Sequence, residues 1–211
     1  LRISDYPSDS SKSLNIEDQG TLVLVVEGKD LLPNKTLMSK GWPNAGSWVL
    51  RNDQNSLPSY GITGTSGQDV LTSPSVWKEQ FEVFTFHKTP YLRSIRVNGT
   101  SIIRMLEEGF SSSAQNDDLI IGGLEQSGIN EHGTFKIAEI LICDEALALD
   151  RIEKLEGYLA HKWTVQDSLT DNHPHKTNPP AFENRPEILL SSPYFIGVDQ
   201  DLNFTIGTNR P

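Results

Sequence analysis

The segment from residue 42 to residue 77 concentrates side chains that can bind a polar ligand. Its candidates are Trp42, Arg51, Asn52, Asp53, Tyr60, Gln68, Asp69 and Trp77. Aromatic rings stack on the C–H face of a sugar, while amide, carboxylate and guanidinium groups hydrogen-bond to its hydroxyls. We therefore predict a ligand-binding surface in this segment. Trp42 stands between Gly41 and Pro43 and is expected to be exposed. Trp48 alternates in phase with Leu50 and is expected in the core.

Catalytic residues in the usual arrangements are missing from the sequence. Glycosidases need two carboxylates about 5.5 Å or about 6.5–9.5 Å apart, which on one strand means acids at i and i+2 or i+4. Glu139 stands in an apolar run without such a partner. No G-x-S-x-G motif marks a nucleophilic serine. No nearby Cys or third His completes a metal site with His173 and His175. We therefore do not expect an enzyme.

Composition argues against two further classes of partner. The chain carries 18 basic and 28 acidic residues, a net charge of −10, which repels the phosphate backbone of nucleic acids. No run approaches the roughly 20 apolar residues of a membrane-spanning helix, so membrane insertion is not expected. The single cysteine, Cys143, lies in the apolar run IAEILIC and predicts a buried, inert thiol.

The elements that would position these side chains are mostly strands. Period-two alternation of apolar residues predicts strands at 21–28, 35–41, 46–52, 59–65, 81–88, 92–97, 100–106, 118–123 and 135–143. Asn98 and Gly99 stand between two alternating runs and predict a type I′ hairpin. Residues 64–78 are rich in Ser, Thr, Gly and Gln with little alternation, which predicts a long loop.

One helix and one domain boundary are predicted near the C-terminus. Apolar residues recur at spacings of three and four between residues 146 and 163, which predicts a helix with one buried face. A turn-rich, proline-containing stretch follows. We predict one domain over residues 1–182, and a linker with the first strands of a following module over residues 183–211. An added edge strand is the alternative for that last segment.

The motif IAEILICDEALALDRIEKLEGYLAHKWTV closely resembles the end of laminin-G-like, concanavalin A-like lectin/glucanase domains of large bacterial extracellular proteins. The tail HPHKTNPP, the hairpin RVNGTSI and the strand DLIIGG resemble further parts of this family. The resemblance covers about residues 16–180. It implies an all-β fold, a two-sheet antiparallel β-sandwich of jelly-roll, concanavalin A-like type, with one short C-terminal helix.

The EGYLAHKW part of this motif is interpreted as structural. Helical phase directs Trp163 toward the apolar stripe and turns His161 away from it. Gly157 would let the helix approach the sheet closely, and Tyr158 and His161 are expected to bond to loop backbone. Relatives place Ser or Thr where this chain has Ala148, so the helix would begin without its usual side-chain cap.

The resemblance implies a non-catalytic, carbohydrate-binding module of a larger secreted or surface protein, for adhesion or polysaccharide targeting. Its expected partners are a glycan or surface polysaccharide and the neighbouring modules of the same polypeptide, in an extracellular, bacterial setting. Several such domains bind Ca²⁺ through oxygen ligands, for which the candidates are Asp53, Asp117 and Asp118. A protein- or peptide-binding module and a structural spacer are the alternatives, and a glycoside hydrolase or lyase is the less favoured one.

Overall fold

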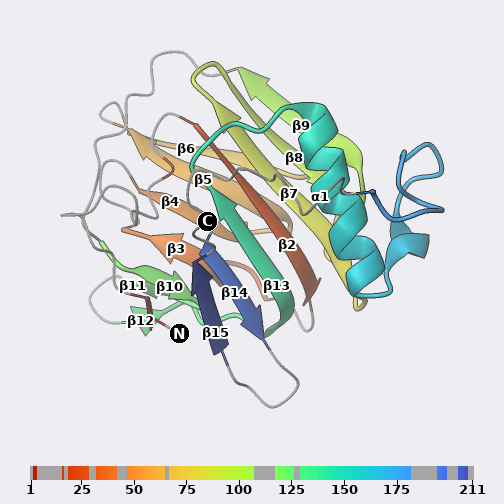
Figure 1. Cartoon of the computed structure of the whole chain (residues 1–211). Coiled ribbons are helices and arrows are strands. Elements are labelled where there is room, and N and C mark those ends of the chain that lie inside the picture. The colour runs from red at the N-terminus through yellow and green to blue at the C-terminus, as the bar shows by residue number, and fades with distance from the viewer. Residues whose placement is uncertain are drawn as a thin grey trace.

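Two large antiparallel sheets, a small two-stranded sheet and one α-helix make up most of the described part of the chain (Figure 1). The computed structural model describes residues 2–3, 16, 19–28, 32–41, 47–64, 67–106, 117–125, 129–181, 194–198 and 204–208. The helix is α1 (Leu149–Lys162), followed by the short 3₁₀ helix η2 (Gln166–Ser168). Within these residues no helix is long and apolar enough to cross a membrane.

The first sheet has six strands. Their spatial order is β1 (Arg2–Ile3), β10 (Leu119–Ile121), β3 (Thr36–Lys40), β4 (Trp48–Asn52), β5 (Pro58–Gly64) and β6 (Gly67–Thr72). Strands β11 (Leu124–Glu125) and β12 (Ile129–Asn130) form a separate two-stranded sheet, which is not paired with the six-stranded sheet. The side chain of Leu124 packs on Val49 of β4, so part of the outer face of the six-stranded sheet is covered.

The second sheet has seven strands. Their spatial order is β15 (Phe204–Thr208), β14 (Tyr194–Val198), β13 (Phe135–Cys143), β2 (Gly20–Gly28), β7 (Glu82–Thr89), β8 (Leu92–Val97) and β9 (Thr100–Leu106). The longest pairing joins β2 to β13, which are far apart in sequence but adjacent in space. All pairings between these strands are antiparallel.

The main core fills the space between the two sheets. Along β2 and β7, Leu22, Leu24, Phe84 and Phe86 point inward and meet the inward side chains of the first sheet. Successive side chains of a strand point to opposite faces of the sheet, so the period-two alternation of apolar residues places one apolar face of each sheet toward the core. The resulting β-sandwich confirms the predicted fold class.

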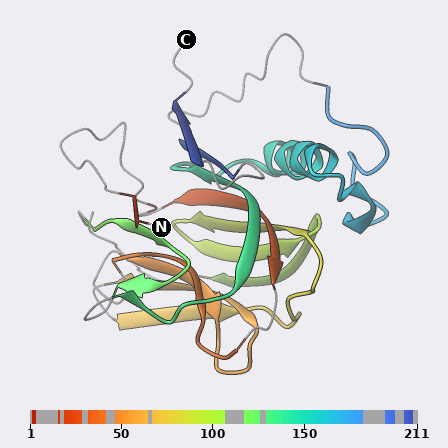
Figure 2. The ribbon, with the colours of Figure 1, turned by 90° about the horizontal axis from the view of Figure 1, so that it is seen from below.

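A second core lies between the seven-stranded sheet and α1. Val23, Val25 and Leu141 are on the outer face of this sheet and pack against Leu155 and Leu159 of the helix. Figure 2 shows the resulting three layers, with α1 on one side of the seven-stranded sheet and the other sheet beneath it. The helix with one buried face that the spacing of three and four predicts is thus confirmed, with Leu155 and Leu159 on that face.

Most predicted elements are confirmed, and one is wrong. Asn98 and Gly99 have φ of 50° and 84°, as a type I′ turn between β8 and β9 requires. The predicted loop at 64–78, however, contains the edge strand β6. Only one face of β6 meets the core, through Leu71, while Gln68 and Val70 are exposed. Because few side chains of this edge strand are buried, its sequence shows little alternation of apolar and polar residues.

The C-terminal strands extend the seven-stranded sheet. Strand β14 pairs with β13 from Tyr194 opposite Ile142 to Gly197 opposite Glu139, and β15 pairs with β14. Figure 1 shows both strands beside β13, at the edge away from β9. Residues 194–198 and 204–208 therefore belong to the same sheet as β13, while the assignment of residues 183–211 to this domain or to a following module stays a prediction. The boundary at residue 182 itself stays a prediction.

Candidate functional site

Three of the predicted ligand-binding residues are buried in the core. Tyr60 and Asn52 have no exposed surface, and Trp77 is 6% exposed. The rings of Trp77 and Phe84 lie 4.4 Å apart, and those of Tyr60 and Phe86 lie 5.8 Å apart. Packing between the two sheets occupies the side chains of Tyr60 and Trp77, and Asn52 Nδ2 donates to the carbonyl oxygen of Leu32 at 3.1 Å. Burial therefore argues against a ligand contact for these three residues. Trp48, also buried, is in the core as expected.

Of the other members of that set, three make structural contacts, one is exposed and one lies outside the described residues. Asp53 Oδ1 accepts hydrogen bonds from the backbone N–H of Asn55 and of Leu57, at 2.7 and 2.9 Å, and so organises the turn between β4 and β5. Arg51 lies 3.4 Å from a carboxylate oxygen of Glu131. Asp69 pairs at 2.6 Å with the fully buried Arg93, which links the sheets. Gln68 is exposed, and Trp42 lies outside the described residues.

The three predicted calcium ligands are not brought together. Lys40 of β3 is opposite both Trp48 of β4 and Leu119 of β10, so Asp117 and Asp118 lie near the start of β4. Asp53 follows the other end of that five-residue strand, about 15 Å away at the usual rise per residue. Asp118 pairs with Arg2. The described residues contain no cluster of three metal-ligating side chains, and calcium binding stays a prediction.

The EGYLAHKW motif fastens the helix to the chain that follows it. A Cβ atom added to Gly157 would lie 2.3 Å from Cβ of His175, so this glycine admits the following segment rather than the sheet, which corrects the prediction. Nε2 of His161 lies 2.9 Å from the carbonyl oxygen of His175, as expected. Trp163 Nε1 donates to Glu139 at 2.7 Å. Tyr158 is half-buried against the helix–sheet core.

The beginning of the helix agrees with the prediction made for Ala148. This residue is the N-cap and makes no side-chain capping bond. Its carbonyl accepts the first helical bonds from the N–H groups of Arg151 and Ile152, each at 3.0 Å. Asp150 lies in the first turn, where a negative charge interacts favourably with the helix dipole.

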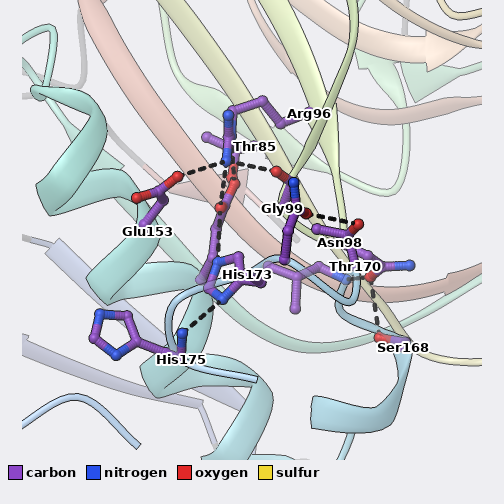
Figure 3. Close-up of polar contacts among 12 residues, drawn as sticks. Thr85, Arg96, Asn98, Gly99, Glu153, Ser168, Thr170, His173 and His175 are labelled. Atoms are coloured by element: carbon purple, nitrogen blue, oxygen red, sulfur yellow. Dashed lines mark hydrogen bonds and ion pairs between the residues drawn. The ribbon is translucent and has the colours of Figure 1, made fainter. Parts of the chain in front are cut away.

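A buried carboxylate, Glu156, organises the space beneath the helix. Its oxygens accept hydrogen bonds from Arg96 Nε at 2.9 Å, Arg96 Nη2 at 3.0 Å and the Thr85 hydroxyl at 2.8 Å. His173 Nε2 lies 3.4 Å from the second oxygen. Figure 3 shows Thr85, Arg96 and His173 converging here, beside Gly99 of the hairpin. These contacts join strands β7 and β8, helix α1 and the segment after the helix.

The protonation states in this cluster follow from the contacts. Nδ1 of His173 accepts a hydrogen bond from the N–H of His175 at 3.2 Å, so the proton of the neutral ring is on Nε2, which faces Glu156. Burial alone would raise the pKa of the Glu156 carboxyl, but the nearby imidazole of His173 and the hydrogen bonds from Arg96 outweigh burial and hold this pKa below its usual value. Glu156 is therefore a carboxylate at neutral pH.

The hairpin residue Asn98 connects this cluster to a surface site. Its Oδ1 accepts the N–H of Val83 at 2.9 Å and the hydroxyl of Ser168 at 3.1 Å, and its Nδ2 donates to Glu82 at 2.8 Å. Its carbonyl oxygen accepts the N–H of Thr170 at 2.9 Å. The left-handed conformation of the turn thus places one amide between β7 and the 166–181 segment.

A hollow of about 260 Å³ opens next to Asn98, and we call it the hairpin pocket. Its polar lining includes Lys78, Glu82, Asn98, Ser168 and Thr170. Its apolar lining is Val76, Val97 and Ile102. Lys78 Nζ lies 2.7 Å from Glu82 Oε1, and the two side chains are 56% and 2% exposed. The pocket therefore offers an ammonium group, a carboxylate, an amide, hydroxyls and an apolar wall.

Sequence reasoning missed this pocket. Lys78, Glu82, Asn98, Ser168 and Thr170 come from three separate parts of the chain, and none of them stands in a motif that indicates binding. The Asn98-Gly99 hairpin was the one available signal, since it fixed where β8 turns into β9. The contact between this hairpin and residues 168 and 170 could be found only from the path that the chain takes after α1.

The chain matches no family model and no curated protein sequence. Among solved structures it is similar to the CBM40 module of a Ruminococcus gnavus IT-sialidase, at 18% identity over 72% of this chain and 92% of that one, with a TM-score of 0.56. The same module bound to α2,3-sialyllactose aligns over 64% and 80% at 15% identity, with a TM-score of 0.55. The NanB sialidase of Streptococcus pneumoniae aligns over 64% of this chain and 23% of that one, at 13% identity and a TM-score of 0.55. What this chain shares with these carbohydrate-binding modules is the jelly-roll β-sandwich fold.

Proposed function

We propose that this chain is a non-catalytic carbohydrate-binding module and that the hairpin pocket holds the sugar. The observation that carries the proposal is the lining of the pocket, where hydrogen-bonding groups of Lys78, Glu82 and Asn98 face an apolar wall. Sugars present the same two faces, hydroxyls on the rim and C–H groups on the flat surface. A shared fold does not imply a shared function, so the proposal rests on the pocket.

The size of the pocket fits a terminal sugar unit. Pockets that enclose drug-sized ligands span about 300–1,000 Å³, and the hairpin pocket, at about 260 Å³, is slightly smaller. It therefore suits one sugar ring at the end of a longer glycan. The similar Ruminococcus gnavus module was determined bound to sialyllactose, which supports a glycan as the class of ligand for this fold.

A single carboxylate in the described lining of the pocket favours binding over hydrolysis. Glu82 is the one acid among the described lining residues, whereas glycoside cleavage uses two carboxyl groups about 5–10 Å apart. In this proposal the module belongs to a larger secreted or surface protein and serves adhesion or polysaccharide targeting, as the laminin-G-like motif implies.

A glycan array followed by calorimetry tests the proposal. Val76→Trp adds a bulky ring at the wall of the pocket, and Leu32→Trp adds the same ring at an equally exposed site, since the two residues are 61% and 62% exposed. We expect at least tenfold weaker binding for Val76→Trp and unchanged binding for Leu32→Trp.

Two outcomes would contradict the proposal. An array without any bound glycan, with and without Ca²⁺, would exclude a carbohydrate-binding module. Full binding by Val76→Trp together with loss of binding by Trp42→Ala would place the site at the surface predicted from the sequence instead of the hairpin pocket.

A further inference from the structure

We propose that the hairpin pocket selects a neutral sugar with two adjacent hydroxyl groups and rejects the acidic counterpart of that sugar. This inference rests on the proposed function and concerns the ligand class of the same pocket. It follows from the fixed hydrogen-bonding directions of Asn98 and Glu82 and from the charge that surrounds them.

The orientation of the Asn98 amide is fixed by the backbone. Its Oδ1 accepts the N–H of Val83 at 2.9 Å, a group that can only donate. Nδ2 must therefore point to Glu82 Oε1, at 2.8 Å. Only one of the two N–H groups of Nδ2 is used in this contact, so the other remains a donor.

Glu82 supplies the matching acceptor. Its Oε1 receives hydrogen bonds from both Lys78 and Asn98. Its Oε2 accepts no hydrogen bond from any residue that the structure describes, while the side chain lines the pocket and is only 2% exposed. A ligand hydroxyl that donates to Oε2 would satisfy a carboxylate oxygen that water reaches poorly, which is where a hydrogen bond contributes most.

Lys78 supplies a second donor at the rim. Its ammonium group has three N–H bonds, of which one is directed to Glu82. The remaining N–H donors of Lys78 and the acceptor Oε2 of the carboxylate that Lys78 contacts lie on neighbouring side chains. They suit two adjacent hydroxyls of a sugar, one accepting and one donating. Val76 and Ile102 leave an apolar wall for the C–H face of the ring.

The charges around the pocket disfavour an acidic ligand. Lys78 is already neutralised by Glu82, so the lining carries no uncompensated positive charge among its described members. Because the Glu82 side chain is 2% exposed and that of Lys78 is 56% exposed, water screens the charge of Lys78 more than that of Glu82, and a net repulsion of a ligand carboxylate remains. The whole chain adds a net charge of −10. The sialylated sugar bound to the similar Ruminococcus gnavus module carries the kind of carboxylate that this pocket is expected to exclude.

The test compares matched neutral and acidic sugars by calorimetry on the native protein. The probes are methyl glycosides of common hexoses, the corresponding hexuronic acids, lactose and α2,3-sialyllactose. We expect a neutral hexoside to bind at least tenfold more tightly than its uronic acid, and removal of one of the two adjacent hydroxyls to weaken binding at least tenfold. Tighter binding of the uronic acid or of sialyllactose than of the neutral partner would overturn the inference while leaving the proposed function intact. If none of the sugars binds, the proposed function fails as well.

A charge-neutral variant gives an independent readout. Glu82→Gln is expected to narrow the ratio of neutral to acidic affinity at least fivefold, since it removes the repulsion. Its matched control is Glu79→Gln, an exposed acid three residues earlier that does not line the pocket, and this variant should keep the native ratio. A ratio that is the same in Glu82→Gln, Glu79→Gln and the native protein would contradict the role assigned to Glu82. The melting temperature of each variant shows whether it is folded.

Discussion

Replacing Glu156 by glutamine removes a charge that the structure uses to hold three segments together. The glutamine has the same size, and it can still accept the hydroxyl of Thr85, which lies 2.8 Å from Glu156. It leaves the Arg96 guanidinium, whose side chain is 8% exposed, without its bidentate carboxylate partner. Breaking a buried ion pair in this way costs about 3–5 kcal/mol.

The expected loss is near the lower limit, about 3 kcal/mol, because glutamine keeps part of the hydrogen bonding. For a domain of this length, each kcal/mol corresponds to roughly 2–4 °C in melting temperature, so Glu156→Gln should melt about 6–12 °C lower. Urea unfolding followed by circular dichroism gives the free energy, and a thermal scan gives the melting temperature.

Glu153→Gln is the matched control. Glu153 is on the same helix, is 27% exposed and lies 3.9 Å from the same Arg96, so its neutralisation should cost at most about 1 kcal/mol. Equal losses in the two variants, or a loss below about 1 kcal/mol in Glu156→Gln, would refute the assignment of Glu156 as the central group of the cluster.

Three further predictions follow from the same region. The pKa of Glu156 is lowered from an ordinary value near 4.5, so the stabilisation from this carboxylate should be complete above about pH 4.5 and should be lost as the pH falls through the lowered pKa. In Glu156→Gln, the free energy of unfolding in urea should therefore depend less on pH over this range. An unchanged pH dependence would contradict this prediction. Gly157→Ala should destabilise the folded protein by about 1–2 kcal/mol despite the better helix propensity of alanine, because the new Cβ would lie 2.3 Å from Cβ of His175. In a double-mutant cycle, His175→Gly should recover this loss. Additive effects of the two substitutions would argue against the contact. Burial, together with the negative charges of nearby acids, raises the pKa of the Cys143 thiol to about 12. Iodoacetamide at pH 8 should therefore leave the native protein unmodified and should label the urea-unfolded protein rapidly. Rapid labelling of the native protein would contradict this prediction.

The strands and the helix could be predicted because their signals are local. Asn98 and Gly99 specify the hairpin within two residues, and the spacing of Leu155 and Leu159 specifies which face of α1 is buried. The edge strand β6 was missed because one of its faces is open to solvent and its sequence is polar.

The candidate site could not be predicted, because it depends on pairings between distant segments. Glu156 and Arg96 are 60 residues apart, and Ser168 and Asn98 are 70 residues apart. Residue type alone also misleads, since an aromatic ring suits a core as well as a sugar platform. Tyr60 and Trp77 were therefore assigned to a ligand surface, whereas register and sheet packing place them between the sheets.

The most direct test of the account is a titration of the ¹⁵N-labelled protein with a neutral methyl hexoside selected on the array, followed by two-dimensional NMR. We expect saturable shifts concentrated in the amide signals of the pocket-lining residues Lys78, Asn98, Ser168 and Thr170. Shifts confined to residues 42–53, or no saturable shifts with any sugar, would contradict it.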